Sequence, residues 1–300
     1  MVQISEIEDP FERYCAFLRE RDAIYKRKSG GHEWPWTDDP ILQTYRFTEV
    51  LRERDKTSLH YQKTVRKVYE DDPLVLPATV FYRWFNRIDT CDYFFNRSGQ
   101  NYSIFEQYML TPRHEAFDVL LEALNNYPTP HVTGAYIING KPGYQKGEGV
   151  LRYFNDWCEK PWRETWLLWR GDVPTLQEMY RWLRIEGAGL GTFMAAQLVA
   201  DLKYVPFMYD MASDWWTWAA PGPGSMRGLN AVMGRPMHQS WNDADWLEKI
   251  QWLRVQENLE LKQHGLGPFH AQDTQNHCCE FSKYEKVRLG LGRPRQVYHV

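Results

Sequence analysis

An aspartate in the second half of the chain follows a glycine-broken helix at a spacing that could serve phosphate binding and catalysis. Residues 183–202 read LRIEGAGLGTFMAAQLVADL, and Asp210 lies nineteen positions beyond Gly191 in the context VPFMYDM. A carboxylate near bound phosphates can act as a general base or stabilise a developing positive charge. The pairing of the glycine-broken helix with this aspartate makes DNA the first ligand to consider.

The phosphate would be held by a helix that begins at the second glycine. Backbone N–H groups at a helix start have no partner within the helix and can bind a phosphate; here they belong to Gly191, Thr192 and Phe193. Glycine suits Gly189 and Gly191 because it can take a positive φ and brings no Cβ toward an approaching strand. The segment thus predicts a nucleic-acid backbone as ligand.

The same segment resembles the helix-hairpin-helix of base-excision DNA glycosylases. The pattern Gly-hydrophobic-Gly, three residues, Ala, two residues, aliphatic is met by Gly189, Leu190, Gly191, Ala195 and Leu198. In that superfamily a catalytic aspartate follows at about this distance, where Asp210 stands. A glycine-broken turn between two core helices has much the same pattern, so this alternative stays open.

Composition and charge narrow the class of protein. A chain of 300 residues with 43% hydrophobic and 25% charged residues can bury a full core. Neither an apolar run of membrane-spanning length nor a signal-peptide pattern is present, so we expect a cytoplasm-like compartment and no membrane partner. Five cysteines without disulfide or CxxC spacing fit a reducing environment. A net charge of −3 argues against non-specific coating of DNA but allows local basic clusters, one of which contains Arg21 and Lys28.

The predicted elements are overwhelmingly helical. Thr175 and Glu178 form a capping box, and Leu176, Met179 and Leu183 mark the buried face of the helix that follows. Further helices are expected near 11–28, 40–56, 76–88, 115–125, 149–157 and 245–261, whereas 131–139 alone has a strand pattern. We predict an all-α, helix-hairpin-helix glycosylase-like fold with at most a small β-hairpin. Residues 1–300 would form one domain, two lobes being the alternative, with hairpin and aspartate in 175–215.

Three nominal motifs carry less weight. Gly134 to Lys141 almost spells a P-loop, but five residues separate the glycines and Pro142 replaces the Ser/Thr that would hold magnesium. The histidines and cysteines between His264 and Cys279 lack zinc-finger spacing, so no metal or other cofactor is predicted. Gly222 to Ser225 forms either an anion-binding turn or a simple loop.

A second resemblance covers most of the chain. Five blocks occur in order: WPWTDDPILQTYRFTEVLRERD at 34–55, FYRWFNRIDT at 81–90, the hairpin with its aspartates, GPGSMRGLN at 222–230 and DTQNHCCEFSKYEKVRLGLGRPR at 273–295. Together they resemble the α-glutamyl/putrescinyl-thymine pyrophosphorylases, or amino acid:DNA transferases, of bacteriophages with hypermodified thymine. The block CCEFSKY at 278–284 is the most specific, because packing alone does not require it.

The resemblance implies an enzyme that displaces the phosphate of 5-phosphomethyl-2'-deoxyuridine in double-stranded DNA with the amino group of an amino acid or polyamine. Glycine, giving Nα-glycinylthymidine, is the expected donor, and the host cytoplasm is the expected location. An enclosed site would require base flipping. Asp210 is expected to be the general base, with Asp201 or Asp214 assisting. Lys283, Arg288 and Arg52 would receive the phosphate, and Glu280 and Tyr284 belong to the same substrate-binding set.

Two other functions fit the same residues. Phe193 stands where strand-cleaving glycosylases have a lysine, so Schiff-base lyase chemistry is not expected. A monofunctional glycosylase is the first alternative, because an aspartate in this place can stabilise an oxocarbenium ion. A non-catalytic DNA-binding module is the second.

Overall fold

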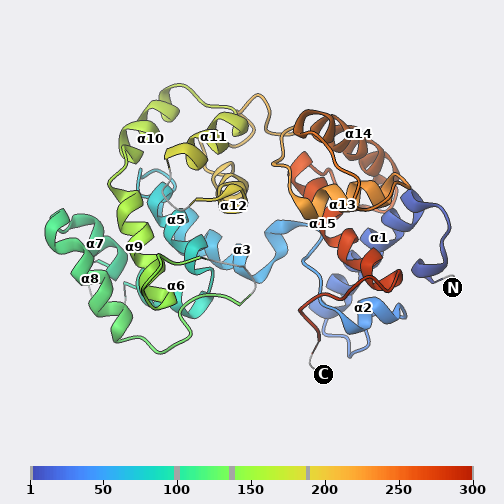
Figure 1. The fold of residues 1–300 in the computed structure, drawn as a ribbon, viewed down its shortest axis with the longest axis horizontal. Helices are drawn as coiled ribbons and strands as arrows, with labels where there is room; N and C mark the ends of the chain where they lie inside the picture. The colour runs from blue at the N-terminus through green and yellow to red at the C-terminus, as the bar shows by residue number, and fades with distance from the viewer. Residues whose placement is uncertain (1–2, 98–101, 135–138, 187–189, 299–300) are drawn as a thin grey trace. The chain divides into compact units, whose positions relative to one another are not determined.

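The computed structural model describes residues 3–97, 102–134, 139–186 and 190–298. Its regular structure is helical throughout these residues, and the β-pairing found in them is one isolated antiparallel bridge between Tyr45 and Val297. The predicted all-α class is therefore confirmed, as Figure 1 shows. Within the described part of the chain, no helix has the length and apolar character needed to span a membrane.

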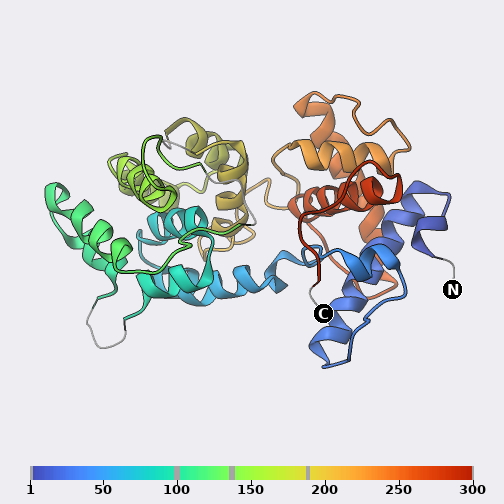
Figure 2. The same cartoon turned by 60° about the horizontal axis from the view of Figure 1, so that its bottom comes forward.

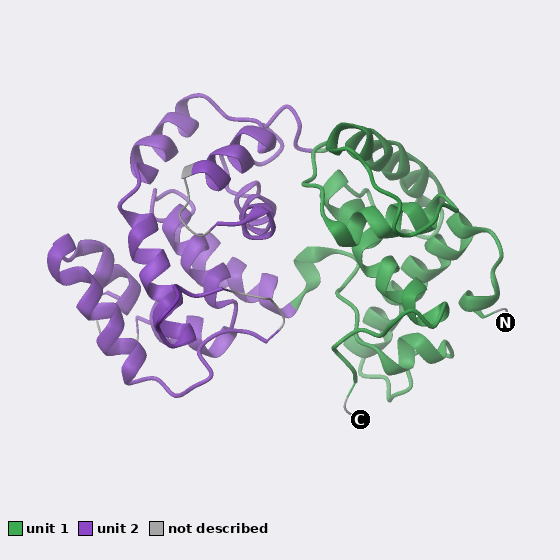
Figure 3. Ribbon diagram, in the orientation of Figure 1, with its two compact units in different colours: residues 1–55, 216–300 green, residues 56–215 purple. Residues whose placement is uncertain are grey.

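The chain forms two compact units, coloured separately in Figure 3. Residues 1–55 and 216–300 make up unit 1, and residues 56–215 make up unit 2. The segment 175–215, predicted to hold the hairpin and the aspartate, lies within unit 2. The substrate-binding residues predicted from the C-terminal block lie within unit 1.

Unit 1 is built around the C-terminal helix. Its elements are the 3₁₀ helices η1 (Ile4–Glu6) and η2 (Arg52–Arg54) and the helices α1 (Pro10–Ser29), α2 (Pro40–Thr44), α13 (Pro223–Val232), α14 (Asp243–Lys262) and α15 (Ala271–Arg288). Asp9 and Asp39 cap α1 and α2, each followed by a proline at the first helical position. Apolar side chains from α1, α13, α14 and α15 form one core.

Two glycines allow α13 to lie against α15, which crosses beside it in both Figure 1 and Figure 2. A Cβ added at Gly228 would lie 1.8 Å from the backbone oxygen of Cys278, and one at Gly224 would lie 2.5 Å from the Sγ of Cys279. The block GPGSMRGLN is not a simple loop: it forms the N-cap, Gly222, and most of the helix α13. Close helix packing explains why small residues recur in it.

Unit 2 surrounds the apolar helix α5 (Val75–Phe85), whose residues are all buried. The ring of Phe81 contacts five other phenylalanine rings, those of Phe85, Phe94, Phe95, Phe105 and Phe154. The other elements are α3 (Lys56–Tyr61), the π-helix η3 (Gln62–Arg66), α4 (Lys67–Tyr69), α6 (Ile88–Phe95), α7 (Ile104–Leu110), α8 (Arg113–Asn125), α9 (Lys146–Cys158), α10 (Trp162–Gly171), α11 (Leu176–Glu186) and α12 (Thr192–Leu202).

One predicted helix is much shorter than expected. The helix predicted for 40–56 ends at Thr44, because the chain then pairs with the C-terminal segment: Arg46 donates its backbone N–H to the oxygen of Gln296 at 3.1 Å. The helix predicted for 76–88 breaks at Asn86, whose φ is +46°. Of the predicted strand 131–139, residues 135–138 lie outside the described residues, and the remainder is not strand.

Candidate active site

The first helix of the predicted hairpin begins and packs as expected. Thr175 donates its backbone N–H to Glu178 Oε2 at 2.8 Å, and Glu178 donates its own to Thr175 Oγ1 at 3.1 Å. This closes the capping box at the start of α11. Leu176, Met179 and Leu183 are fully buried. Both the predicted cap and the predicted core face are confirmed.

The second helix, α12, starts at the surface. Gly191 is its N-cap, and Gly191, Thr192 and Phe193 are exposed, with 49% of Phe193 accessible. The φ of Gly191 is −71°, and an added Cβ would meet nothing within 4 Å. Neither a positive φ nor a close approach therefore requires glycine at this position. Gly189, the other predicted DNA-binding glycine, lies outside the described residues.

Asp210 is exposed in the turn-rich segment that follows α12. Its φ is +58°, in the left-handed region that aspartate tolerates better than most residues. Its neighbours Tyr209 and Met211 are exposed as well, although both side chains are largely apolar. The predicted catalytic carboxylate thus lies at a surface with accessible aromatic and apolar groups.

Asp201 has a different environment from Asp210. It is only 3% exposed, and both of its oxygens accept hydrogen bonds from the guanidinium of Arg83 on α5, with Nη2 at 2.8 Å from Oδ1. Arg83 also donates to Asn86 Oδ1 at 3.0 Å and lies over the ring of Tyr61. A buried carboxylate held in this way joins α12 to α5, and its assistance to the general base stays a prediction.

Asp214 caps a helix. Its two oxygens accept the backbone N–H groups of Leu176 at 2.7 Å and Gln177 at 3.1 Å, at the start of α11. Of the three carboxylates predicted for general-base chemistry, Asp210 is the exposed one, whereas Asp201 and Asp214 hold helices in place.

The second group of predicted residues lies on α15 in unit 1. Glu280 is buried and accepts Lys283 Nζ at 2.5 Å and the backbone N–H of Thr48 at 3.3 Å. Burial lowers the pKa of Lys283 while the Glu280 carboxylate raises it, and the carboxylate prevails. Tyr284 is buried and donates to Asp39 Oδ2 at 2.8 Å, and burial raises its pKa.

The remaining predicted cations are also in unit 1. Arg288 donates from Nε and Nη2 to the two oxygens of Glu285, both at 2.8 Å, and these bonds raise its pKa. Arg52 lies in η2 and is partly buried. Because Lys283 and Arg288 are each bonded to a carboxylate of their own helix, a phosphate would have to compete for them.

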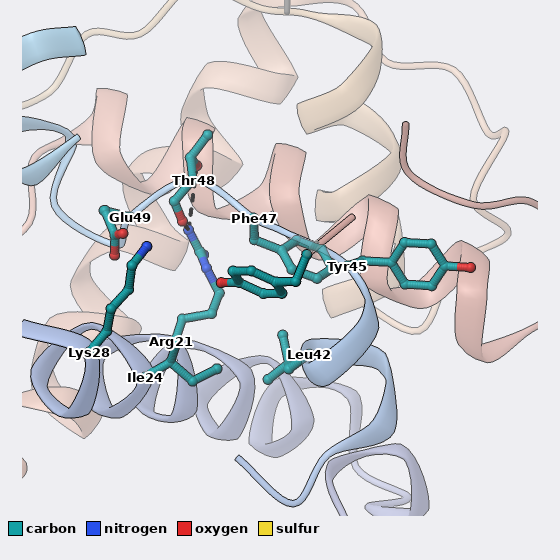
Figure 4. Close-up of a pocket in the computed structure, with 9 residues that line it drawn as sticks. Arg21, Ile24, Lys28, Leu42, Tyr45, Phe47, Thr48 and Glu49 are labelled. Atoms are coloured by element: carbon teal, nitrogen blue, oxygen red, sulfur yellow. Dashed lines mark hydrogen bonds between the residues drawn. The ribbon is translucent and has the colours of Figure 1, made fainter. Parts of the chain in front are cut away.

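A small pocket in the same unit contains residues to which the sequence assigned no role. It lies between α1 and the segment after α2. Figure 4 shows Arg21 and Lys28 extending from α1 toward Thr48 and Glu49. Burial raises the pKa of Glu49, and repulsion by Asp55 adds to this. The sequence does contain a signal that Arg21 is buried, because it stands between Phe17 and Ile24 on the apolar face of its helix.

The predicted absence of a metal rests on the sequence alone. Among the described residues, no group of three or more His, Cys, Asp or Glu side chains could hold an ion. Two of the histidines near the C-terminus have other partners: His270 accepts the backbone N–H of Asp273, and His277 lies 3.3 Å from the buried Glu257.

The described residues thus form an all-helical protein with an exposed carboxylate after a surface helix start in unit 2 and a polar pocket in unit 1. Comparison with known proteins identifies the family to which the chain belongs. The family model described as "5-hmdU DNA kinase, helical domain" matches residues 8–291, and the chain belongs to this family.

A curated relative carries the same name. The 5-hmdU DNA kinase of Bacillus phage SP10 is 27% identical over 299 residues, which is 91% of this chain and 44% of the relative. The chain thus spans less than half the length of that protein. No solved structure matches. These matches support an enzyme family of phage hydroxymethyluridine DNA. They support neither the transferase family that the sequence blocks resemble nor membership of the helix-hairpin-helix superfamily.

Proposed function

We propose that the chain acts on hydroxymethyluridine-derived nucleotides in phage DNA, and that it transfers an amine to the base. Membership of the helical-domain family of 5-hmdU DNA kinases supports the first part of this proposal, and the sequence blocks that resemble the amino acid:DNA transferases support the second. Phosphorylating the hydroxymethyl group of 5-hmdU gives a 5-phosphomethyl group, whose phosphate can depart when an amine attacks. A domain of such a kinase is well placed to use that product.

The reaction balances without an oxidant or reductant. The amine nitrogen forms a bond to the 5-methylene carbon, and the carbon–oxygen bond breaks with its electron pair leaving on the phosphate. The amine must lose a proton for this attack, and a carboxylate can accept it. We assign this role to Asp210, because it is exposed and stands at the spacing of the catalytic aspartate in the family that the hairpin resembles, whereas Asp201 is buried.

The start of α12 would bind the DNA backbone. Its exposed Thr192 and Phe193 contribute backbone N–H groups at the positive end of the helix dipole, which favours a phosphate. The accessible ring of Phe193 can stack on an unpaired base, as extrusion of the target nucleotide requires. The partners are then double-stranded DNA with 5-phosphomethyluracil and a free amino acid such as glycine, in the cytoplasm of the infected host.

A second function is favoured by the relative's length. More than half of the SP10 protein lies outside the region that this chain matches. The chain could therefore position hydroxymethyluridine DNA for phosphorylation by another domain without carrying out chemistry itself.

One experiment separates these functions. DNA carrying 5-phosphomethyluracil is incubated with the protein and a panel of amines, digested to nucleosides and weighed. An adduct mass with amine-dependent phosphate release supports the transferase, whereas abasic sites support a glycosylase. DNA retention without either product supports the positioning module.

The residue test is Asp210→Asn. We expect turnover to fall by roughly 10²–10⁴-fold, the usual contribution of a general base. Stability and DNA affinity should persist, because the site is exposed and asparagine tolerates a positive φ. Asp118→Asn, an exposed carboxylate on α8, is the matched control. Equal turnover in the two variants would remove Asp210 from the mechanism.

A further inference from the structure

Arg21 in unit 1 has hydrogen-bonding capacity that the fold does not use. The side chain is 4% exposed and lines the pocket beside Thr48. Its Nη2 donates to the backbone oxygen of Thr48, while Nε and Nη1 are buried without a hydrogen-bond partner. Burying an N–H donor without an acceptor costs folding free energy. A buried cation with two such donors is therefore typical of a site where a bound ligand supplies the acceptor.

The other residues of the pocket define the ligand. Lys28 adds a second cation, and Glu49 supplies a carboxylate on the facing segment (Figure 4). Ile24, Leu42 and Phe47 form an apolar wall. A cation with two nitrogens that lack an acceptor and a carboxylate within one small pocket match the two charges of a zwitterion.

We propose that this pocket binds a free amino acid, whose α-carboxylate accepts from Arg21 and whose α-ammonium donates to Glu49. That the bound amino acid is the amine donor rests on the function proposed above. The pocket would then hold the donor of the reaction, a part for which the sequence offered no residue.

The surrounding charges favour a zwitterion over a phosphate. Burial lowers the pKa of Arg21, and the carboxylates of Glu280, Glu49 and Asp55 raise it, so a dianion entering here would meet three acidic groups as well as the guanidinium. A zwitterion adds no net charge. Burial and the neighbouring Asp55 raise the pKa of Glu49, whereas Arg21, Lys28 and Arg46 lower it, and a ligand ammonium would act in the same direction as these cations.

The test is direct binding to the protein without DNA, measured by calorimetry. The probes are glycine, glycinamide, acetate, putrescine and inorganic phosphate. We expect glycine to bind at least about tenfold more tightly than glycinamide or acetate, because each of these lacks one charged contact. Saturation by phosphate with no competition from glycine would overturn the proposal, as would the absence of any glycine binding.

Variants keep the result independent of folding defects. Glu49→Gln and Lys28→Gln change less buried positions, and Arg21→Lys retains a charge at the buried one. We expect Glu49→Gln and Arg21→Lys to weaken glycine binding at least about tenfold while melting as a single transition. Lys26→Gln, on the same helix but outside the pocket, is the control.

The two proposals fail in different ways. Glycine binding without any adduct on DNA would leave the pocket in place and refute the transferase. An adduct that forms with an unchanged KM for glycine in both Glu49→Gln and Arg21→Lys would leave the transferase in place and refute the pocket.

Discussion

Two blocks that carry family resemblance occupy opposite environments. On α15 in unit 1, Cys278, Glu280 and Tyr284 are buried and engaged with the rest of their unit. At the start of α12 in unit 2, Gly191 and Phe193 are exposed. The first block is needed to build its unit, whereas the second presents groups that a ligand can reach.

The contrast separates residues that look alike in sequence. Asp201 lies in the last turn of α12 and Asp210 in the segment that follows it, yet Asp201 is bonded to Arg83 in the core and Asp210 lies at the surface. Gly228 and Gly191 are both motif glycines, yet a Cβ would clash at Gly228 and meet nothing at Gly191. A motif shows that residues belong together and leaves open whether they serve the fold or a ligand.

The largest effect on stability is expected for Asp201→Ala. Removing one partner of a buried ion pair leaves the Arg83 charge uncompensated, which costs about 3–5 kcal/mol. Denaturant unfolding of Asp201→Ala against the exposed control Asp118→Ala measures this difference. The double variant Asp201→Leu, Arg83→Met should recover much of the loss. A cost below about 1 kcal/mol for Asp201→Ala would return this carboxylate to the candidates for catalysis.

Gly228→Ala should have an intermediate effect. The added methyl would overlap the backbone oxygen of Cys278, so α13 and α15 would have to separate, at a cost of about 1–3 kcal/mol. Gly191→Ala is the matched variant in the exposed block, where we expect no more than about 1 kcal/mol from a poorer N-cap. Thermal unfolding of both compares them. Equal losses would show that the glycines do not differ in the way the contacts indicate.

Local patterns were the predictable part of this molecule. The capping box of Thr175 and Glu178 and the buried face of α11 involve residues within one or two turns, so their spacing determines them. The end of α2 depends instead on pairing with the C-terminal segment near Val297, more than two hundred positions away. The helix propensity of residues 40–56 contains no information about such a distant contact.

The candidate site divides in the same way. Asp210 could be selected because its distance from the glycine-broken helix is visible in the sequence. The partner of Asp201 could not, because Arg83 lies 118 positions away. Arg21 was visible as part of a basic run, but only its burial beside Thr48 shows two nitrogens without acceptors. Pairing and burial decide which charges remain available to a ligand.

The smallest effect on stability, and the sharpest test of the exposed block, is expected for Phe193→Ala. About half of this side chain is already accessible, so its removal should cost under about 1 kcal/mol of unfolding free energy. If the ring stacks on an unpaired base, the same change should weaken DNA binding by about 1–3 kcal/mol. Fluorescence anisotropy with a duplex carrying a mismatched target base measures the affinity, and Leu168→Ala, another exposed apolar residue of unit 2, is the control. Loss of stability without loss of affinity would mean that Phe193 serves the fold, and the contrast between the start of α12 and α15 would disappear.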